Sequence, residues 1–334
     1  MNRRALLLLM TIGPLLGGAG LAGASSALTA KARAAITDYA RLLMIEHKPE
    51  QAFARYYAPH LIQHDPEIGD GGGGDNAFLE ARQKAHPGKY DPPEKYVTVV
   101  HTILADGDLV AIASHVFTNP QDKGRLFVDI WRMENGRFAE HWDVIQPIAA
   151  NRANAVGCGV GVTYAAARKA GDTVAHPACG MPDHSVDSEA SRRTVLAYME
   201  LGQQPGKIAE AVRTYVAPDF IQHSANIAPG RRALIEYLTS REAARRAVRR
   251  TSSIARTLAD GDMVLVHRRV TTDSDPRGTA YADLFRLRGG KIVEHWDVIQ
   301  PIPDFSVSGR SMVEGPLEPG RHKEGPSAAG KERQ

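Results

Sequence analysis

The stretch Glu-His-Trp-Asp-Val-Ile-Gln-Pro-Ile at residues 140–148 recurs without a change at residues 294–302. Shorter matches precede it in the same order in each half of the chain, among them Leu-Ala-Asp-Gly-Asp and an Ile-Gln-His segment. Internal repetition of this kind indicates one structural unit present twice, and it has to be recognised before a fold is assigned. The sequence therefore predicts two copies of one domain, at residues 33–149 and 189–303.

The composition is that of a globular protein. Of 334 residues, 43% are hydrophobic and 24% are charged, and the formal net charge is only +3. Charge alone therefore predicts no polyanion as partner. Arginines gather at residues 241–250, but such runs usually form a solvated helix face, and no aromatic residue is interleaved for stacking on bases. We expect no nucleic-acid partner.

Residues 1–24 have the pattern of an export signal. Arg3 and Arg4 form a basic start, a mostly apolar run follows, and Ala-Gly-Ala at residues 22–24 fits a cleavage site. The paired arginines fit a loose twin-arginine pattern, and the general secretory route is an equal alternative. We predict a periplasmic or secreted protein with no stable membrane insertion after cleavage.

Two segments outside the repeats lack regular patterning. Residues 150–188 form a predicted linker, and residues 304–334 form a predicted disordered tail. The linker holds both cysteines of the sequence, Cys158 and Cys179. In an oxidising compartment they can form a disulfide, but their separation in sequence does not show whether their Cβ atoms meet. Both states stay open.

Each copy shows helical spacing first and strand-like alternation afterwards. In the first copy we predict helices at 32–45 and 49–57, an extended segment at 61–64, a glycine-rich connector at 70–76 and strands at 96–105, 109–118, 125–134 and 137–145. In the second copy we predict helices at 191–201, 207–215 and 231–248, an extended segment at 220–223 and four strands between 251 and 300. This order predicts the α+β class, with a curved antiparallel sheet wrapped over the helices.

The Ile-Gln-His segment, the Asp-Gly-Asp hairpin and the closing strand Glu-His-Trp-Asp-Val-Ile-Gln together resemble the SnoaL-like branch of the nuclear transport factor 2-like superfamily. The resemblance implies two tandem cone-shaped α+β barrels, each with one open mouth. Members of the family include cofactor-independent polyketide cyclases that perform an aldol condensation, and relatives of ketosteroid isomerase. Such domains commonly dimerise through their sheets. An intrachain pseudo-dimer or a homo-oligomer is therefore expected.

Alternation along the closing strand separates two sets of side chains. His141 and Asp143 share one face, whereas Glu140 and Trp142 share the other. In the SnoaL-like cyclases the acid/base is an aspartate at the position that matches Asp143, preceded two residues earlier by a histidine. The resemblance therefore implies Asp143 and His141 as catalytic residues inside the cone, with Glu140 and Trp142 at the sheet interface.

The second copy keeps the catalytic pair and changes part of its surroundings. His295 and Asp297 are the matching catalytic candidates, but Arg269 stands where the first copy has His115. This change predicts either a different substrate or an anion-tolerant binding pocket in the second cone. The predicted substrate-binding residues of the two copies are His64, His115, Asp129, His223, Arg269 and Asp283.

The expected chemistry needs a base that removes a proton alpha to a carbonyl and a donor that stabilises the enolate. Burial in an apolar cone raises the pKa of a carboxyl toward a useful range, so Asp143 suits the task without a cofactor. The expected ligand is a small apolar or carbonyl-containing compound. His64, His141 and Asp143 also have the composition of an iron site, but their spacing is not diagnostic and we predict no metal.

Two non-enzymatic interpretations stay open beside this one. A His-x-Asp pair on a strand can be a structural hydrogen-bonded pair. The domains could then bind a small ligand without transforming it, or they could serve as interaction domains with filled cones. A cavity beside Asp143 or Asp297 would fit an enzyme or a ligand-binding domain, whereas an interaction domain would have a filled cone.

Overall fold

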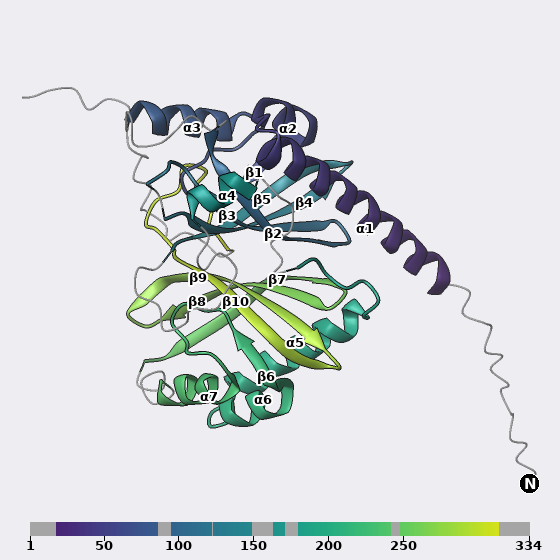
Figure 1. The fold of residues 1–334 in the computed structure, drawn as a ribbon, viewed down its shortest axis with the longest axis vertical. Helices are drawn as coiled ribbons and strands as arrows, with labels where there is room; N and C mark the ends of the chain where they lie inside the picture. The colour runs from purple at the N-terminus through teal and green to yellow at the C-terminus, as the bar shows by residue number, and fades with distance from the viewer. Residues whose placement is uncertain are drawn as a thin grey trace, which may run out of the picture.

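The computed structural model describes residues 18–85, 95–121, 123–148, 163–170, 180–241 and 248–313. Two lobes of the same architecture are stacked on each other, with their sheets facing inward (Figure 1). In this view α2 and α3 lie above the upper sheet, and α6 and α7 lie below the lower one. The predicted α+β class and the tandem arrangement are confirmed.

The first lobe begins with helices and ends with a hairpin series of strands. Its elements are α1 (Gly18–Ala40), the π-helical turn η1 (Arg41–Ile45), α2 (Pro49–Tyr56), β1 (Tyr57–Gln63), α3 (Gly74–Ala85), β2 (Val97–Asp106), β3 (Leu109–Phe117), β4 (Arg125–Glu134) and β5 (Arg137–Pro147). At the tight β4–β5 turn, Asn135 and Gly136 adopt φ angles of 52° and 77°, which suit the strongly twisted two-residue hairpin that Asn-Gly favours.

The second lobe repeats this plan after α4 (Tyr164–Ala170). Its elements are α5 (Ser188–Gln203), α6 (Ile208–Tyr215), β6 (Val216–Gln222), α7 (Arg231–Ser240), β7 (Arg250–Asp260), β8 (Met263–Thr272), β9 (Asp275–Arg288) and β10 (Lys291–Pro301). The side chain of Asp187 caps α5 by accepting two backbone N–H groups, which a helix start leaves without partners.

The strand order is β1-β5-β4-β3-β2 in the first sheet and β6-β10-β9-β8-β7 in the second. The predicted extended segments form β1 and β6, and each pairs in parallel with the closing strand of its own copy. The other neighbours are antiparallel. Both sheets are open and curved, so the cones are not closed barrels.

The segment after β1 differs from the prediction. We expected a connector in the first copy where the second has a helix, but α3 begins at Gly74 and runs for 12 residues. A Cβ at Gly74 would lie 2.3 Å from the carbonyl oxygen of Gly69, so only glycine fits this helix start. In the second copy α7 ends at Ser240, short of the predicted end at residue 248.

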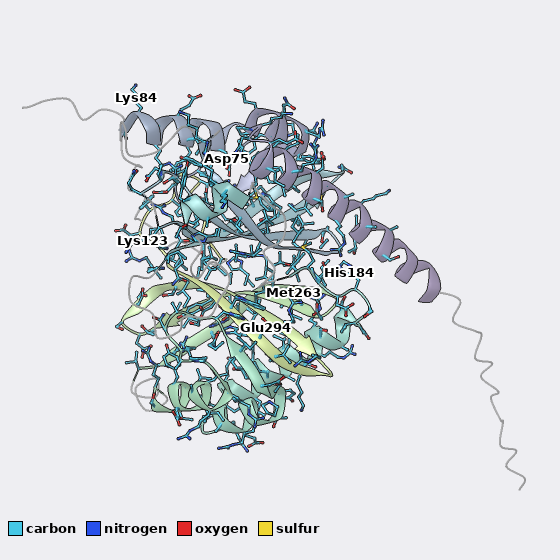
Figure 2. The ribbon with its side chains drawn as sticks, viewed as in Figure 1. Asp75, Lys84, Lys123, His184, Met263 and Glu294 are labelled. Atoms are coloured by element: carbon cyan, nitrogen blue, oxygen red, sulfur yellow. The ribbon has the colours of Figure 1, made fainter. Side chains whose placement is uncertain are left out.

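The two sheets pack against each other through one hydrophobic cluster. Trp142 and Val144 of β5 belong to it, together with Trp296 and Val298 of β10. Met263 is fully buried in the same cluster and lies between the lobes in Figure 2. The face of the closing strand that we assigned to the interface therefore does lie there.

Hydrogen bonds across this interface are reciprocal. The side-chain oxygen of Gln146 accepts the backbone N–H of Ile299 at 2.9 Å, and that of Gln300 accepts the backbone N–H of Ile145 at 2.6 Å. The same contact is therefore made twice, once in each direction between the copies, which is the signature of a two-fold interface. The chain is an intrachain pseudo-dimer.

The Asp-Gly-Asp hairpins supply two further reciprocal contacts. Arg33 of α1 pairs with Asp260 at 2.6 Å, and the equivalent Arg192 of α5 pairs with Asp106 at 2.5 Å. Each aspartate also accepts a backbone N–H from the other copy. The sequence marked these aspartates only as turn residues. In the folded chain they join the two copies.

Residues 304–313, the beginning of the predicted tail, pack along the interface toward the first copy. Met312 and Val313 are buried in the interface cluster. Arg310 forms an ion pair with Asp70 of the first copy. This segment is therefore part of the fold, and residues 314–334 lie outside the described residues, as do both cysteines of the linker.

The predicted signal lies mostly outside the described residues. Residues 18–24 form the start of α1, and α1 continues through the predicted cleavage site to Ala40. Among the helices that the structure describes, none has both the length and the hydropathy needed to cross a membrane.

The interface ion pairs are expected to contribute strongly to stability. Asp260 is buried and accepts from both Arg33 and the backbone N–H of Ala105, so Asp260→Ala removes the charged partner of Arg33 and leaves that N–H without its acceptor. We expect its free energy of unfolding in urea to fall by about 3 kcal/mol. Asp219 forms an exposed pair with Arg288, and Asp219→Ala should cost less than about 1 kcal/mol. Equal losses for the two variants would contradict this role of Asp260.

Candidate functional site

The closing strand β5 directs its two faces in opposite directions. Because Trp142 and Val144 face the second copy, His141 and Asp143 point into the cone beneath the helices. On the next strand, Asp129 lies directly opposite Asp143. Side-chain atoms of Asp129, His141 and Asp143 all lie within 4.8 Å of one another. The structure brings these three predicted site residues together.

Carboxyl groups crowd the first cone. Asp143 is almost completely buried, and Asp65 from the loop after β1 hydrogen-bonds to it. Burial raises the pKa of Asp143 well above its ordinary value, and the charges of Asp65 and Asp129 raise it further. Burial also raises the pKa of Asp75 to about 6. Figure 2 shows Asp75 on the helical side of the upper sheet.

Gln63 fixes the orientation of His141. Its side-chain oxygen accepts the backbone N–H groups of His64 and Asp65, each at 3.0 Å, and backbone N–H groups can only donate. The same oxygen lies 2.7 Å from Nδ1 of His141, so Nδ1 carries a hydrogen. In the neutral ring Nε2 then presents its lone pair to the cone, 3.4 Å from Asp129.

The second copy holds the matching histidine in the same way. Gln222 accepts the backbone N–H of Ser224 at 2.9 Å, and Nδ1 of His295 donates to the same oxygen at 3.0 Å. Here Nε2 of His295 also has an acceptor, since it lies 3.2 Å from the carboxylate of Asp283. Both ring nitrogens of His295 therefore lie within hydrogen-bond distance of oxygen acceptors.

A buried arginine distinguishes the second cone from the first. Arg268 of β8 forms two hydrogen bonds with Asp283, at 2.6 and 3.3 Å, and its guanidinium lies 4.2 Å from the ring centre of Tyr281. The first copy has Ser114 at this position, and it has Asp65 where the second copy has Ser224. The second cone therefore gains a positive charge and loses a negative one.

This charge difference moves two neighbouring pKa values in opposite directions. Burial alone would raise the pKa of Asp283, but the charges of Arg268 and His295 outweigh burial and lower it to about 2. Burial raises the pKa of Asp297, the residue opposite Asp283 on β10, above its ordinary value, and His295 only partly opposes the rise. One carboxylate is held ionised, and its neighbour is poised to exchange a proton.

A cavity of about 990 Å³ opens in the second copy. Apolar and aromatic residues of α5, α6 and α7 line much of it. The polar site residues in its lining are Ser224, Arg268, Asp283, His295 and Asp297. The cavity beside Asp297 argues against a filled cone in this copy, and so against the interpretation as an interaction domain.

The model of the SnoaL-like domain matches residues 36–141 and again residues 195–295, which is more than half of the chain. The chain belongs to the SnoaL-like family. Both matches fall within the predicted copies. The fold and the resemblance expected from the repeated motif are therefore confirmed, with one SnoaL-like domain in each lobe. No curated protein matches the chain.

Solved structures resemble one SnoaL-like copy at a time. A candidate SnoaL-like polyketide cyclase from Jannaschia sp. CCS1 is 22% identical over 35% of this chain and 90% of its own, with a TM-score of 0.29. A candidate ketosteroid isomerase from Kribbella flavida DSM 17836 is 16% identical over 34% and 79%, with a TM-score of 0.29. A nuclear transport factor 2-like protein of unknown function from Mesorhizobium loti is 19% identical over 36% and 96%, with a TM-score of 0.30.

Two predicted binding residues of the SnoaL-like copies lie outside the cones. His64 stacks on Trp142 with ring centres 5.0 Å apart, and its Nε2 lies 3.0 Å from Glu140. His223 makes the same two contacts with Trp296 and Glu294 in the second copy. The backbone turns after the preceding glutamine, so the histidines stay on the interface side of the sheet, away from Asp143 and Asp297.

The other two predicted binding residues, His115 and Arg269, each lie one position away from a residue that faces the cone. Because Ile112 opposes Asp129 inside the first cone, Ser114 shares that face and His115 lies on the other. His115 stacks on Phe117 and its Nε2 donates to a backbone carbonyl outside the cone. Arg269 likewise contacts backbone carbonyls, those of Pro276 and Arg277 at the start of β9, whereas its neighbour Arg268 lines the cavity.

Gln63, Gln222 and Asp65 are site residues that the sequence analysis did not select. A signal for the two glutamines was present, because Ile-Gln-His occurs at the same place in both copies. We read its histidine as the functional residue. The glutamine instead is fully buried in each copy and orients the histidine of the closing strand.

The lowered pKa of Asp283 predicts a pH-dependent stability. A carboxylate whose pKa is lowered on folding contributes stability that is complete above about pH 4 and is lost as the pH falls toward 2. Asp283→Asn also leaves Arg268 without its buried partner, so we expect a loss of about 3 kcal/mol at pH 6. The difference in free energy of unfolding between Asp283→Asn and the unchanged protein, called the gap below, should narrow by about 1–2 kcal/mol between pH 5 and pH 2.

Urea unfolding of both proteins across this pH range measures the gap. Asp219→Asn is the matched control, because Asp219 is exposed in an ion pair on the surface. A gap between Asp283→Asn and the unchanged protein that stays constant with pH would show that Asp283 is not held ionised by Arg268 and His295.

Proposed function

We propose that the second copy is a cofactor-independent acid/base catalyst that moves a proton alpha to the carbonyl of a small, largely apolar compound. Aldol condensation, cyclisation and isomerisation all begin with this step. The observation that carries the proposal is the pair Asp283 and Asp297 in one cavity lining, with pKa values moved in opposite directions. Such a difference in pKa suits Asp283 as a fixed negative charge and Asp297 as the group that exchanges protons.

Asp297 is the base in this mechanism. In its ionised form it removes the alpha proton, and its raised pKa lets it return that proton or protonate the product. The apolar walls of the cavity keep the carboxylate poorly solvated, which strengthens it as a base. A substrate carbon near Asp297 would also lie near His295 and Arg268, which line the same cavity.

His295 and Arg268 stabilise the enolate oxygen. The guanidinium of Arg268 brings a positive charge, and the ring nitrogen of His295 brings a hydrogen-bonding group, into a site that contains the ionised Asp283. Asp283 holds both of these side chains in place and remains ionised itself. Preorganised charge of this kind is worth most where the negative charge develops. No metal or organic cofactor takes part in this mechanism.

Non-catalytic binding is the alternative function, and the size and apolar lining of the same cavity favour it. Proton exchange separates the two. A panel of small ketones and 1,3-dicarbonyl compounds would be incubated with the protein in D₂O, and loss of the alpha-proton signal would be followed by proton NMR.

We expect Asp297→Asn to slow exchange by at least about 100-fold, because an amide cannot take up the proton. The matched control Asp219→Asn, far from the cavity lining, should exchange at the rate of the unchanged protein. A compound that binds without any exchange in the unchanged protein would support the binding function. Equal exchange by Asp297→Asn would remove Asp297 as the base.

The pH profile gives a further expected outcome. A base acts when deprotonated, so the exchange rate should rise with pH through the raised pKa of Asp297. The midpoint should lie above the ordinary aspartate value of 3.8. A rate that falls across the same range would assign the step to a protonated group instead.

We also propose that the protein acts outside the cytoplasm, because residues 1–24 combine a basic start, an apolar run and an Ala-x-Ala site. Expression of the full chain in a bacterial host, followed by N-terminal sequencing of the periplasmic fraction, tests this. Cleavage after Ala24 should give a mature chain that begins at Ser25. Recovery of the uncut chain from the cytoplasm alone would contradict export.

A further inference from the structure

The first cone carries a different arrangement from the catalytic site that we propose in the second. Asp129, His141 and Asp143 each offer one ligand atom, and these atoms lie within 4.8 Å of one another. Asp65 hydrogen-bonds to Asp143 and adds a further carboxyl beside them. Carboxyl groups therefore converge on one point from β4, β5 and the loop after β1.

The second copy shows what a positive charge does at the equivalent point. There Asp283, which matches Asp129, is neutralised by two hydrogen bonds from Arg268. In the first copy Ser114 replaces this arginine, and its buried hydroxyl makes no hydrogen bond among the residues that the structure describes. The first cone thus keeps the carboxylate and has a neutral side chain where the second has the balancing cation.

His141 is oriented as a ligand. Gln63 accepts the hydrogen of Nδ1 at 2.7 Å, which leaves the lone pair of Nε2 directed at Asp129, 3.4 Å away. Within the described part of the chain, Nε2 of His141 and Oδ1 of Asp143 have no hydrogen-bond partner, although both residues are more than nine-tenths buried. Buried polar atoms without partners carry a high cost in free energy.

We propose that the first copy binds one divalent transition-metal ion through His141 Nε2 and the carboxylates of Asp129 and Asp143. An imidazole with two carboxylates suits Zn²⁺ or Mn²⁺, whereas Mg²⁺ and Ca²⁺ prefer oxygen ligands alone. Gln63 acts as the outer partner that fixes the histidine, as metal-binding histidines usually require. Asp65 supplies a fourth ligand or orients Asp143.

This site differs from the iron-type set considered from the sequence. Its ligands include Asp129, which lies opposite Asp143, and do not include His64, because His64 lies on the interface side of the sheet. The ion would occupy the place that the Arg268 guanidinium takes in the second copy. The two cones of the chain would then balance their carboxylates differently, one with a side chain and one with a metal ion.

Equilibrium dialysis of the full chain against Zn²⁺ and against Mn²⁺ tests the proposal, with bound metal measured by elemental analysis. We expect one ion per chain. Asp129→Asn should weaken binding at least tenfold, because it removes one charged ligand and leaves the shape of the side chain. Ser114→Arg should abolish binding, because it introduces the guanidinium that the second copy already uses.

Two histidine variants serve as matched controls. His295→Gln changes the equivalent histidine of the second copy, and His60→Gln changes an exposed histidine of β1. Both should bind one ion with unchanged affinity. Circular dichroism of every variant checks folding, and if Ser114→Arg does not fold, Asp129→Asn decides alone.

Three results would overturn the proposal. They are no binding of either ion, binding unaffected by both Asp129→Asn and Ser114→Arg, and binding lost equally in His295→Gln. The last would place the ion in the second copy or on histidines in general. Metal binding is measured without any substrate, so this test and the proton-exchange test of the second copy can fail independently.

Discussion

The face-to-face packing of the two sheets is the constraint on which the rest of this structure depends. Trp142 and Trp296 are buried between the lobes, and neighbouring side chains of a strand point to opposite faces. Burial of the tryptophans therefore directs Asp143 and Asp297 into the cones. A shift of the closing strand by one residue would move the tryptophan into the cone and the carboxyl into the interface. One pattern thus determines both the pseudo-dimer and the two sites.

Within this common frame the two sites have diverged through few residues. Arg268 in place of Ser114, and Ser224 in place of Asp65, change the balance of charge inside the cone. In the second cone the fixed cation separates the pKa values of two neighbouring carboxyls, and a large apolar cavity lies beside them. In the first cone the carboxyls crowd together, which favours either protons or a metal ion.

Much of the site followed from the repeated nine-residue string, because alternation alone assigned Asp143 inward and Trp142 outward. The errors concern other elements. The pairing of β3 with β4 decides whether Ser114 or His115 faces inward. Alternation along β3 separates its two faces but does not show which of them lies inside the cone. His64 follows the end of β1, where the chain turns and alternation no longer applies. Helix α3 was missed because the glycines before it were read as a connector.

The sequence by itself determined the tandem α+β fold, the family and the two faces of each closing strand, because these depend on local periodicity and on repetition. Only the tertiary structure decided which residues share a cone. Gln63 meets His141 across strands that are distant in sequence, and Arg268 meets Asp283 through the register of two neighbouring strands. The reciprocal pairs of Arg33 with Asp260 and of Arg192 with Asp106 join residues of different copies. Contacts of this kind depend on register and packing, which no single segment encodes.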